Sequence, residues 1–192
     1  MKRVAFIRHG KKSGELISPE QIQEIEKNGI PGLNEILDDK NNVSICLGSS
    51  LERTKQAAMA FNKYLESKSY GPRPLIAADK RFGNAELFKL ITSNQKLMDL
   101  QMKVGWIKSF EQVDPELLLN IQQSQFLALN NIFEEISEDE VAVVIGHTPM
   151  IELLAIFSDE GVDENLSLKE LQGVLFQQTD GCEITVAQMI GK

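Results

Sequence analysis

The sequence predicts a three-layer α/β sandwich, in which helices cover both faces of a mainly parallel central sheet and the chain ends in an antiparallel hairpin. Short apolar runs rich in β-branched residues alternate with longer segments of helical period, which is typical of this class. No internal repeat or linker-like segment divides the chain. Because 192 residues are enough for one well-buried core and few for two, we expect a single domain over residues 1–192.

Four apolar runs are expected to form the buried, parallel part of the sheet. They lie at Lys2–Arg8, 43–48, Leu75–Ala78 and 141–146. Two further runs, Gly173–Gln178 and 182–190, flank the dipeptide Asp180-Gly181. Asp-Gly is favoured in type I′ turns, so these last runs predict the closing hairpin.

Three helices are signalled by caps and by apolar spacing. Ser49 and Glu52 have the spacing of a capping box, and apolar residues then recur at steps of three and four, namely Leu51, Thr54, Ala58, Phe61 and Leu65. Asp114 before a proline predicts a second helix, over 115–136. Thr148 with the following proline predicts a cap for a short helix that ends near residue 157. Segments 15–40 and 82–110 are expected to be helical pieces and loops at one end of the sheet.

The charge balance disfavours nucleic acid as a partner. The chain has 20 Lys and Arg against 28 Asp and Glu, for a formal charge of -8, so most of its surface repels a polyanion. Near the N-terminus, however, Lys2, Arg3, Arg8, Lys11 and Lys12 all precede the first acidic residue. A local cationic site on an acidic protein indicates a small anionic ligand.

Nothing in the sequence predicts a membrane span or a secretory signal. The longest apolar runs are far shorter than the roughly 20 residues that cross a bilayer, and the N-terminal run is too short for the apolar region of a signal peptide. We therefore expect a cytoplasmic location. Cys46 and Cys182 are distant in sequence and show no paired spacing, so we expect reduced thiols.

The only two histidines each follow a predicted buried strand. His9 comes after the first strand and His147 after the fourth, while Arg53 falls in the first turn of the helix that follows the second. Taken singly, such residues are more often structural. Ligands of open parallel sheets bind at the carboxyl ends of the strands, so the joint placement of the three at that edge predicts a functional site.

These residues resemble the histidine phosphatase superfamily, which is also called phosphoglycerate mutase-like. Its opening triplet stands here as Arg8-His9-Gly10, and its serine followed four residues later by a helix arginine matches Ser49 and Arg53. A second histidine after a late strand matches His147. The run Gly-His-Thr-Pro-Met-Ile-Glu around it is more similar to the small phosphatases, including phosphohistidine phosphatases, than to the glycolytic mutases.

The resemblance implies a role for each matched residue. His9 is expected to attack phosphorus as a neutral imidazole and to form a phosphohistidine intermediate. Arg8 and Arg53 are expected to bind phosphate oxygens and to lower the pKa of His9. His147 is expected to donate a hydrogen bond to the phosphoryl group, and the amides near Thr148 to add to the binding of the anion.

Protonation of the leaving group needs an acid, and the resemblance makes Glu86 the candidate. It lies 33 residues beyond Arg53, with Phe82 and Phe88 close by in sequence, and we expect partial shielding and a bound phosphate to raise its pKa. Some small phosphatases of this group have no such carboxylate, and Asp79 is an alternative. The role of Glu86 is therefore left open.

We expect a metal-independent phosphatase that needs no cofactor and acts on a small phosphorylated compound or on a phosphohistidine protein. A mutase-type phosphotransferase and a non-catalytic module that binds a phosphate ligand remain alternatives. A cysteine phosphatase is disfavoured because six residues separate Cys46 from Arg53 where that loop has five. Lys11 and Lys12 are either cations at the mouth of the site or solvated lysines, and the sequence leaves oligomeric state open.

Overall fold

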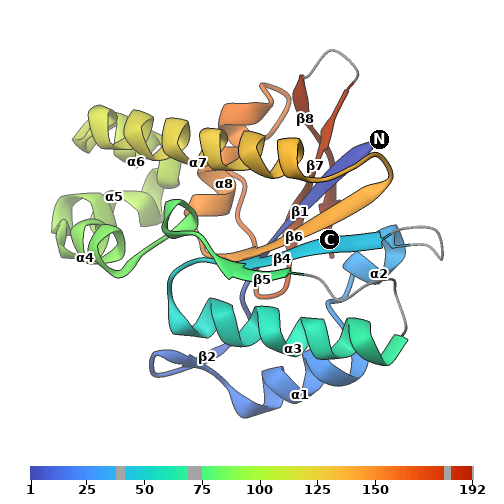
Figure 1. Ribbon diagram of the computed structural model, residues 1–192. Helices are drawn as coiled ribbons and strands as arrows, with labels where there is room; N and C mark the ends of the chain where they lie inside the picture. Colours follow the sequence, from blue (N-terminus) through green and yellow to red (C-terminus); the bar gives the residue numbers. More distant parts are fainter. Residues whose placement is uncertain (38–41, 69–74, 180–182, 192) are drawn as a thin grey trace.

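The computed structural model describes residues 1–37, 42–68, 75–179 and 183–191. Within them, six strands form one sheet in the order β5-β4-β6-β1-β7-β8 (Figure 1). The strands are β1 Lys2–Arg8, β4 Asn42–Gly48, β5 Leu75–Ala78, β6 Glu140–Gly146, β7 Gly173–Gln178 and β8 Ile184–Ile190. The first four are parallel, and β7 and β8 form an antiparallel hairpin, so the predicted fold class and strands are confirmed. The predicted turn at Asp180-Gly181, and Cys182, lie outside the described residues.

Helices cover both faces of the sheet, as predicted. They are α1 Pro19–Asn28, α2 Leu33–Ile36, α3 Glu52–Lys68, α4 Ala85–Ser93, α5 Gln95–Val104, α6 Trp106–Val113, α7 Pro115–Glu135 and α8 Met150–Ser158, with a 3-10 turn η1 at Lys80–Phe82. In Figure 1, α1 and α3 lie below the sheet and α7 and α8 above it. Residues of β1 alternate between these two layers, because successive side chains of a strand point to opposite faces: Ala5 and Ile7 pack with α3, and Val4 and Phe6 pack with α7.

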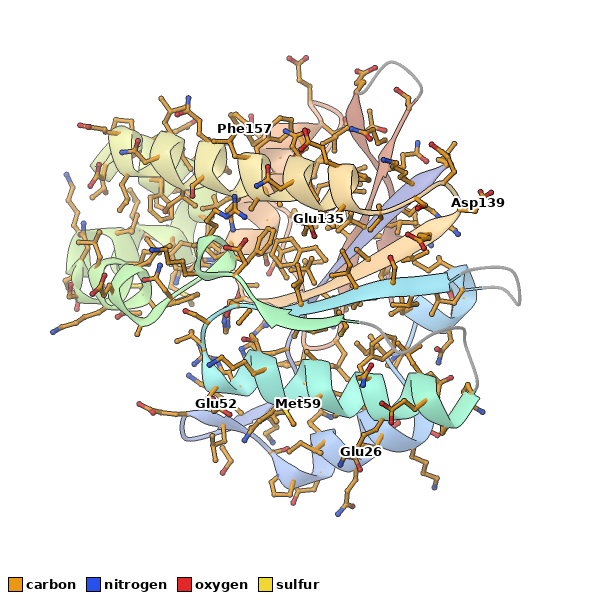
Figure 2. All side chains as sticks on the ribbon, viewed as in Figure 1. Glu26, Glu52, Met59, Glu135, Asp139 and Phe157 are labelled. Carbon is orange, nitrogen blue, oxygen red and sulfur yellow. The ribbon has the colours of Figure 1, made fainter. Side chains whose placement is uncertain are left out.

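The amphipathic character of α3 shows how the pattern in the sequence becomes a layer. Ala58, Phe61 and Leu65 are buried against the sheet, whereas Met59 is 53% exposed. Figure 2 shows Met59 on the side of α3 that faces away from the sheet. The helical spacing of the apolar residues therefore fixes which face of α3 is buried.

Of the two segments expected at one end of the sheet, only 82–110 lies at the loop end. The described part of 15–40 instead places α1 against α3 below the sheet (Figure 1). Helix α2 lies near the amino end of β1, where the Ile36 carbonyl accepts from Arg3 Nη1 at 3.2 Å. Segment 82–110 forms α4, α5 and most of α6, which lie beyond the carboxyl ends of the central strands in Figure 1. These helices share an apolar cluster with α7 and α8, including Ile91, Leu97 and Phe110. Nearer the N-terminus, two short strands, β2 Lys12–Ser13 and β3 Leu16–Ile17, pair with each other. Sequence analysis missed them because two residues carry no periodic signal.

Two predicted caps are wrong and one is confirmed. Helix α3 begins at Glu52, not near Ser49, because the Ser49 hydroxyl is held by two buried side chains before the helix starts. Helix α8 begins at Met150 and has no side-chain cap, so Thr148 does not cap it. The Asp114 carboxylate does accept from the Leu117 amide at 3.0 Å and caps α7.

Candidate active site

The carboxyl ends of three neighbouring strands bring the predicted polar side chains together. Arg8 ends β1 and is followed by His9, His147 follows β6, and Arg53 lies in the first turn of α3, just after β4. Strands β4, β6 and β1 are adjacent, so the residues that follow them meet at one edge. They line a pocket of about 230 Å³, together with other residues. Its lining residues are Arg8, His9, Lys12, Arg53, Phe88, His147, Thr148 and Glu170.

His9 has its two ring nitrogens in different environments. Its Nδ1 lies 2.6 Å from the Gly10 carbonyl oxygen, which can only accept, so Nδ1 carries the proton and donates. Its Nε2 then has a free lone pair, and it accepts a hydrogen bond from Arg53 Nε at 3.2 Å. The backbone therefore fixes the tautomer in which Nε2 is the nucleophilic atom.

Burial keeps the His9 ring neutral. The side chain is only 8% exposed, and this desolvation lowers its pKa to about 4. The hydrogen bond to the Gly10 carbonyl opposes this shift, and the positive charges of Arg53, Arg8 and Lys12 add to it. At neutral pH the Nε2 lone pair is available without prior deprotonation.

His147 is buried beside His9 and is also neutral. Its Nε2 lies 2.7 Å from Ser49 Oγ, and its ring centroid lies 4.9 Å from that of His9. Burial first, then the neighbouring ring and the charge of Arg53, lower its pKa. Its Nδ1 is buried and has no hydrogen-bond partner among the described residues. Burial of a polar atom without a partner is costly.

A chain of hydroxyls indicates where the His147 proton lies. Thr54 Oγ1 donates to the Leu51 carbonyl oxygen at 2.7 Å, so its own proton is used. The Ser49 hydroxyl, which lies 2.9 Å from Thr54 Oγ1, then gives its one proton to that oxygen, so Ser49 Oγ accepts a hydrogen bond from His147 Nε2 at 2.7 Å. In that arrangement the ring proton of His147 is on Nε2, and the buried Nδ1 carries a lone pair.

The two arginines give the pocket a positive field. Arg8 donates through Nη1 to the Leu168 carbonyl at 2.5 Å and through Nη2 to Glu170 Oε1 at 3.4 Å. Arg53 is half-buried, and its guanidinium lies 5.8 Å from the centre of the Phe88 ring. Burial lowers the pKa of Arg53, but a guanidinium keeps its charge at any physiological pH. Planar guanidinium groups match the oxygens of phosphate, so the pocket suits that group.

The predicted acid, Glu86, lies on the helix that contributes Phe88 to the pocket. It lies in the first turn of α4 with an exposed side chain, and it is not among the residues that line the pocket. Phe88, two residues further along, is the side chain of α4 that does line it. The alternative carboxylate, Asp79, is held by Arg81 at 2.5 Å.

Of the two lysines after the first motif, one lines the pocket and one does not. Lys12 is exposed and lines the pocket, and Lys11 lines a neighbouring groove that shares Glu170 with it. Thr148 lies at the pocket just before α8.

Cys46 points into the core, where burial raises the pKa of its thiol to about 12. The residue that suggested a cysteine phosphatase is therefore an inert core side chain.

One pocket residue has no counterpart in the sequence prediction. Glu170 lies in the segment between α8 and β7, and no local pattern marks it.

Within the described ranges, no cluster of three or more His, Cys, Asp or Glu side chains is arranged to hold a metal ion. No helix in those ranges has the length and apolar character that crossing a membrane requires.

Comparison with known proteins identifies the fold through solved structures. No protein-family model matches the chain, and no curated protein sequence does. A phosphoglycerate mutase from Bacillus anthracis str. Sterne is similar with a TM-score of 0.68 at 17% identity, over 97% of this chain and 91% of its own. A phosphoserine phosphatase from Entamoeba histolytica, in complex with 3-phosphoglyceric acid, gives 0.65 at 11% identity, over 100% and 98%.

A third solved structure extends the comparison to a protein phosphatase. The protein histidine phosphatase SixA, complexed with tungstate, gives a TM-score of 0.53 at 12% identity, over 98% of this chain and 96% of its own. All three likenesses cover nearly the whole of both chains, and they agree with the mostly parallel sheet and C-terminal hairpin described above. The chain therefore has the phosphoglycerate mutase-like α/β fold.

Proposed function

We propose that this single-domain protein is a histidine phosphatase that hydrolyses a phosphomonoester or a phosphohistidine, without a metal ion, through a covalent intermediate on His9. The observation that carries the proposal is the state of the His9 ring. Its Nδ1 proton is held by the Gly10 carbonyl, and its Nε2 lone pair faces a positively charged pocket. A neutral imidazole held beside two arginines is what an in-line attack on phosphorus requires.

In the first half of the reaction the phosphoryl group moves to His9. Arg8 and Arg53 bind its oxygens, and Arg53 Nε turns from His9 Nε2 to the phosphate as the substrate enters. His147 donates a hydrogen bond to the same group. His9 Nε2 attacks phosphorus, the P–N bond forms as the bond to the leaving oxygen breaks, and that oxygen takes a proton from an acid.

In the second half, water releases the phosphate. A base takes a proton from water, the oxygen attacks phosphorus, and the P–N bond breaks to restore neutral His9. The cations that stabilise the first transition state serve the second in the same way. The assignment of Glu86 as the acid and base stays a prediction, although its side chain lies outside the pocket lining.

The solved structures of similar fold indicate the class of substrate. They include a phosphoserine phosphatase, a protein histidine phosphatase and a mycobacterial glucosyl-3-phosphoglycerate phosphatase. A pocket of about 230 Å³ has room for a phosphoryl group and a small part of its leaving group. Both facts support a small phosphorylated compound or a phosphohistidine side chain as the substrate.

A mutase is the second candidate, because a phosphoglycerate mutase is among the structures of similar fold. In a mutase the phosphoryl group on His9 returns to another oxygen of the bound product instead of to water. A non-catalytic module that binds a phosphate ligand is the third, since the same cations would hold an anion without any turnover.

One experiment separates the three candidates. Wild type and the His9→Ala variant are quenched during turnover of a generic phosphate ester and of 3-phosphoglycerate, and intact mass and free phosphate are measured. A phosphoryl adduct in wild type alone, with phosphate release, is the expected result. Isomerised phosphoglycerate in place of free phosphate would support the mutase, and phosphate binding without adduct or release would support the module.

A further inference from the structure

We propose that Glu170 is the catalytic carboxylate of this site, which gives a proton to the leaving oxygen and then takes one from the attacking water. The inference rests on the proposed function, because it completes the proton transfers of that reaction. It assigns them to a residue that the sequence does not mark and that lies 84 positions after the candidate that the sequence suggests.

The position of Glu170 is the first observation. Among the residues that the structure describes, it is the only carboxylate lining the pocket that contains His9, Arg53 and His147. Its Oε1 lies 3.4 Å from Arg8 Nη2, so it sits beside a cation that is expected to bind the phosphoryl group. A proton donor must be able to reach the leaving oxygen, and a carboxylate in the pocket lining satisfies the first condition for that.

The segment that carries Glu170 is held firmly against β1. The Arg8 amide donates to the Gln172 carbonyl at 2.8 Å, and the Leu171 amide donates to the Arg8 carbonyl at 3.1 Å. The Gln172 side chain donates to the Gly191 carbonyl and accepts from the Lys169 amide, at 2.8 Å in both cases. Glu170 is thus the exposed tip of a segment that is fixed on both sides.

The backbone next to Glu170 is strained. Leu171 has a φ of 60°, in the left-handed region that a branched apolar residue rarely adopts, and its side chain is buried. Strain of this kind persists where the surroundings determine the conformation, often at functional sites. Here the left-handed turn at Leu171 directs the chain so that Glu170 reaches the pocket while Leu171 fills the core.

Binding of substrate changes the charges around Glu170 in a way that suits proton transfer. A phosphate dianion competes with Glu170 for Arg8, which frees the carboxylate beside a bound negative charge. In the proposed step the proton reaches Glu170 from solvent before the leaving oxygen departs. That proton passes to the leaving oxygen as its bond to phosphorus breaks, and the resulting carboxylate later accepts a proton from water as the P–N bond breaks.

The test is the Glu170→Gln variant, because glutamine keeps the size and the oxygen acceptor for Arg8 but cannot transfer a proton. Single-turnover formation of the phosphoryl adduct is measured with an alkyl phosphate, whose leaving alkoxide needs a proton, and with p-nitrophenyl phosphate, whose leaving phenolate does not. We expect adduct formation to slow by about 100-fold with the alkyl ester and by less than about threefold with the aryl ester. We also expect the adduct to accumulate, because its attack by water is slowed.

Two companion variants define the outcomes. Glu160→Gln, at an exposed glutamate outside the pocket lining, is the matched control and should behave as wild type. An equal loss with both esters in Glu170→Gln would overturn the proposal, because it would show that Glu170 only positions Arg8. The leaving-group-dependent loss in Glu86→Gln, without one in Glu170→Gln, would overturn it in favour of Glu86. If wild type forms no adduct at all, the proposed function itself falls.

Discussion

Charged groups at the two ends of β1 differ in how far they are exposed to solvent and in how they are paired. At the amino end, the Met1 ammonium lies 2.5 Å from Glu138 and 3.2 Å from Asp139, and these carboxylate side chains are 69% and 86% exposed. Figure 2 shows Asp139 at the end of the molecule opposite α4, α5 and α6. At the carboxyl end, Arg8 and Arg53 are partly buried beside neutral histidines, and the pocket they line contains one carboxylate among the described residues.

The difference shows what each group of charges is for. Exposed pairs at the amino end are satisfied within the protein and screened by solvent, so they contribute little to stability and nothing to binding. The pocket holds the side chains of Arg8, Lys12 and Arg53 close together, an arrangement that attracts an anion. The charges at the carboxyl end are therefore placed for binding, whereas those at the amino end are paired with one another.

The largest effect that this comparison predicts comes from removing a pocket cation. Arg53→Met should lower kcat/KM by about 10²- to 10³-fold, because one aligned donor to the transition state is lost. The free energy of unfolding should change by less than about 1 kcal/mol, since the lost contacts to His9 and Phe88 are offset by relief from burying a charge. Steady-state kinetics and urea unfolding measure the two quantities.

Arg53→Lys is the control for charge alone. A lysine keeps the positive charge but lacks the planar fork of donors, so most of the loss in kcat/KM should remain. The opposite result would be an Arg53→Met variant that unfolds much more easily than wild type and shows no selective loss of activity. That result would show that Arg53 has a structural role, and the charges at the two ends of β1 would then no longer differ in function.

The second prediction concerns pH and follows from the burial of His9. Its pKa is lowered from about 6.5 to about 4, so between these values the unfolded chain binds a proton that the folded chain does not. Stability must therefore fall as pH falls from about 6.5 to about 4, by about 3 kcal/mol from this residue. The acid limb of kcat/KM, after correction for ionisation of the substrate, should have its midpoint near pH 4 and not near 6.5.

The His9→Ala variant isolates that contribution. Its unfolding free energy should depend less on pH between 4 and 6.5 than that of wild type, because the titrating ring is gone. Saturating phosphate should flatten the same slope in wild type, since the anion favours a protonated ring in the pocket. If the unfolding free energy of His9→Ala depends on pH as steeply as that of wild type, the His9 ring is as solvated as the charges at the amino end.

Sequence patterns predicted the sheet and its helices well because those depend on local periodicity. The bounds of β1 and β5 match the apolar runs, and the Asp114 cap fixes the start of α7. The pairing of β2 with β3 was missed, because strands of two residues have no period to detect.

The site was predictable where residues lie at the carboxyl ends of strands or, as Arg53 does, in the first turn of the helix that follows. Arg8, His9 and His147 were found in this way, and the structure brings them to one pocket. Glu170 was not found, because it reaches the pocket through a left-handed backbone turn at the next residue, in a segment whose many acidic residues make one glutamate unremarkable. The hydrogen bond between Ser49 and His147 joins residues 98 positions apart, which local spacing cannot show.

The smallest predicted effect belongs to the amino end. Asp139 has a φ of 64°, and glycine adopts that conformation without cost, so Asp139→Gly relieves a mild strain while it adds freedom to the unfolded chain. The exposed contact to the Met1 ammonium is lost as well, and pairs of this kind are worth little. These small effects largely cancel, so the free energy of unfolding should change by less than about 0.5 kcal/mol, with kcat/KM unchanged. A clear loss of activity in Asp139→Gly would contradict the division between the two ends, because it would show that the amino end of β6 transmits strain along the strand to His147.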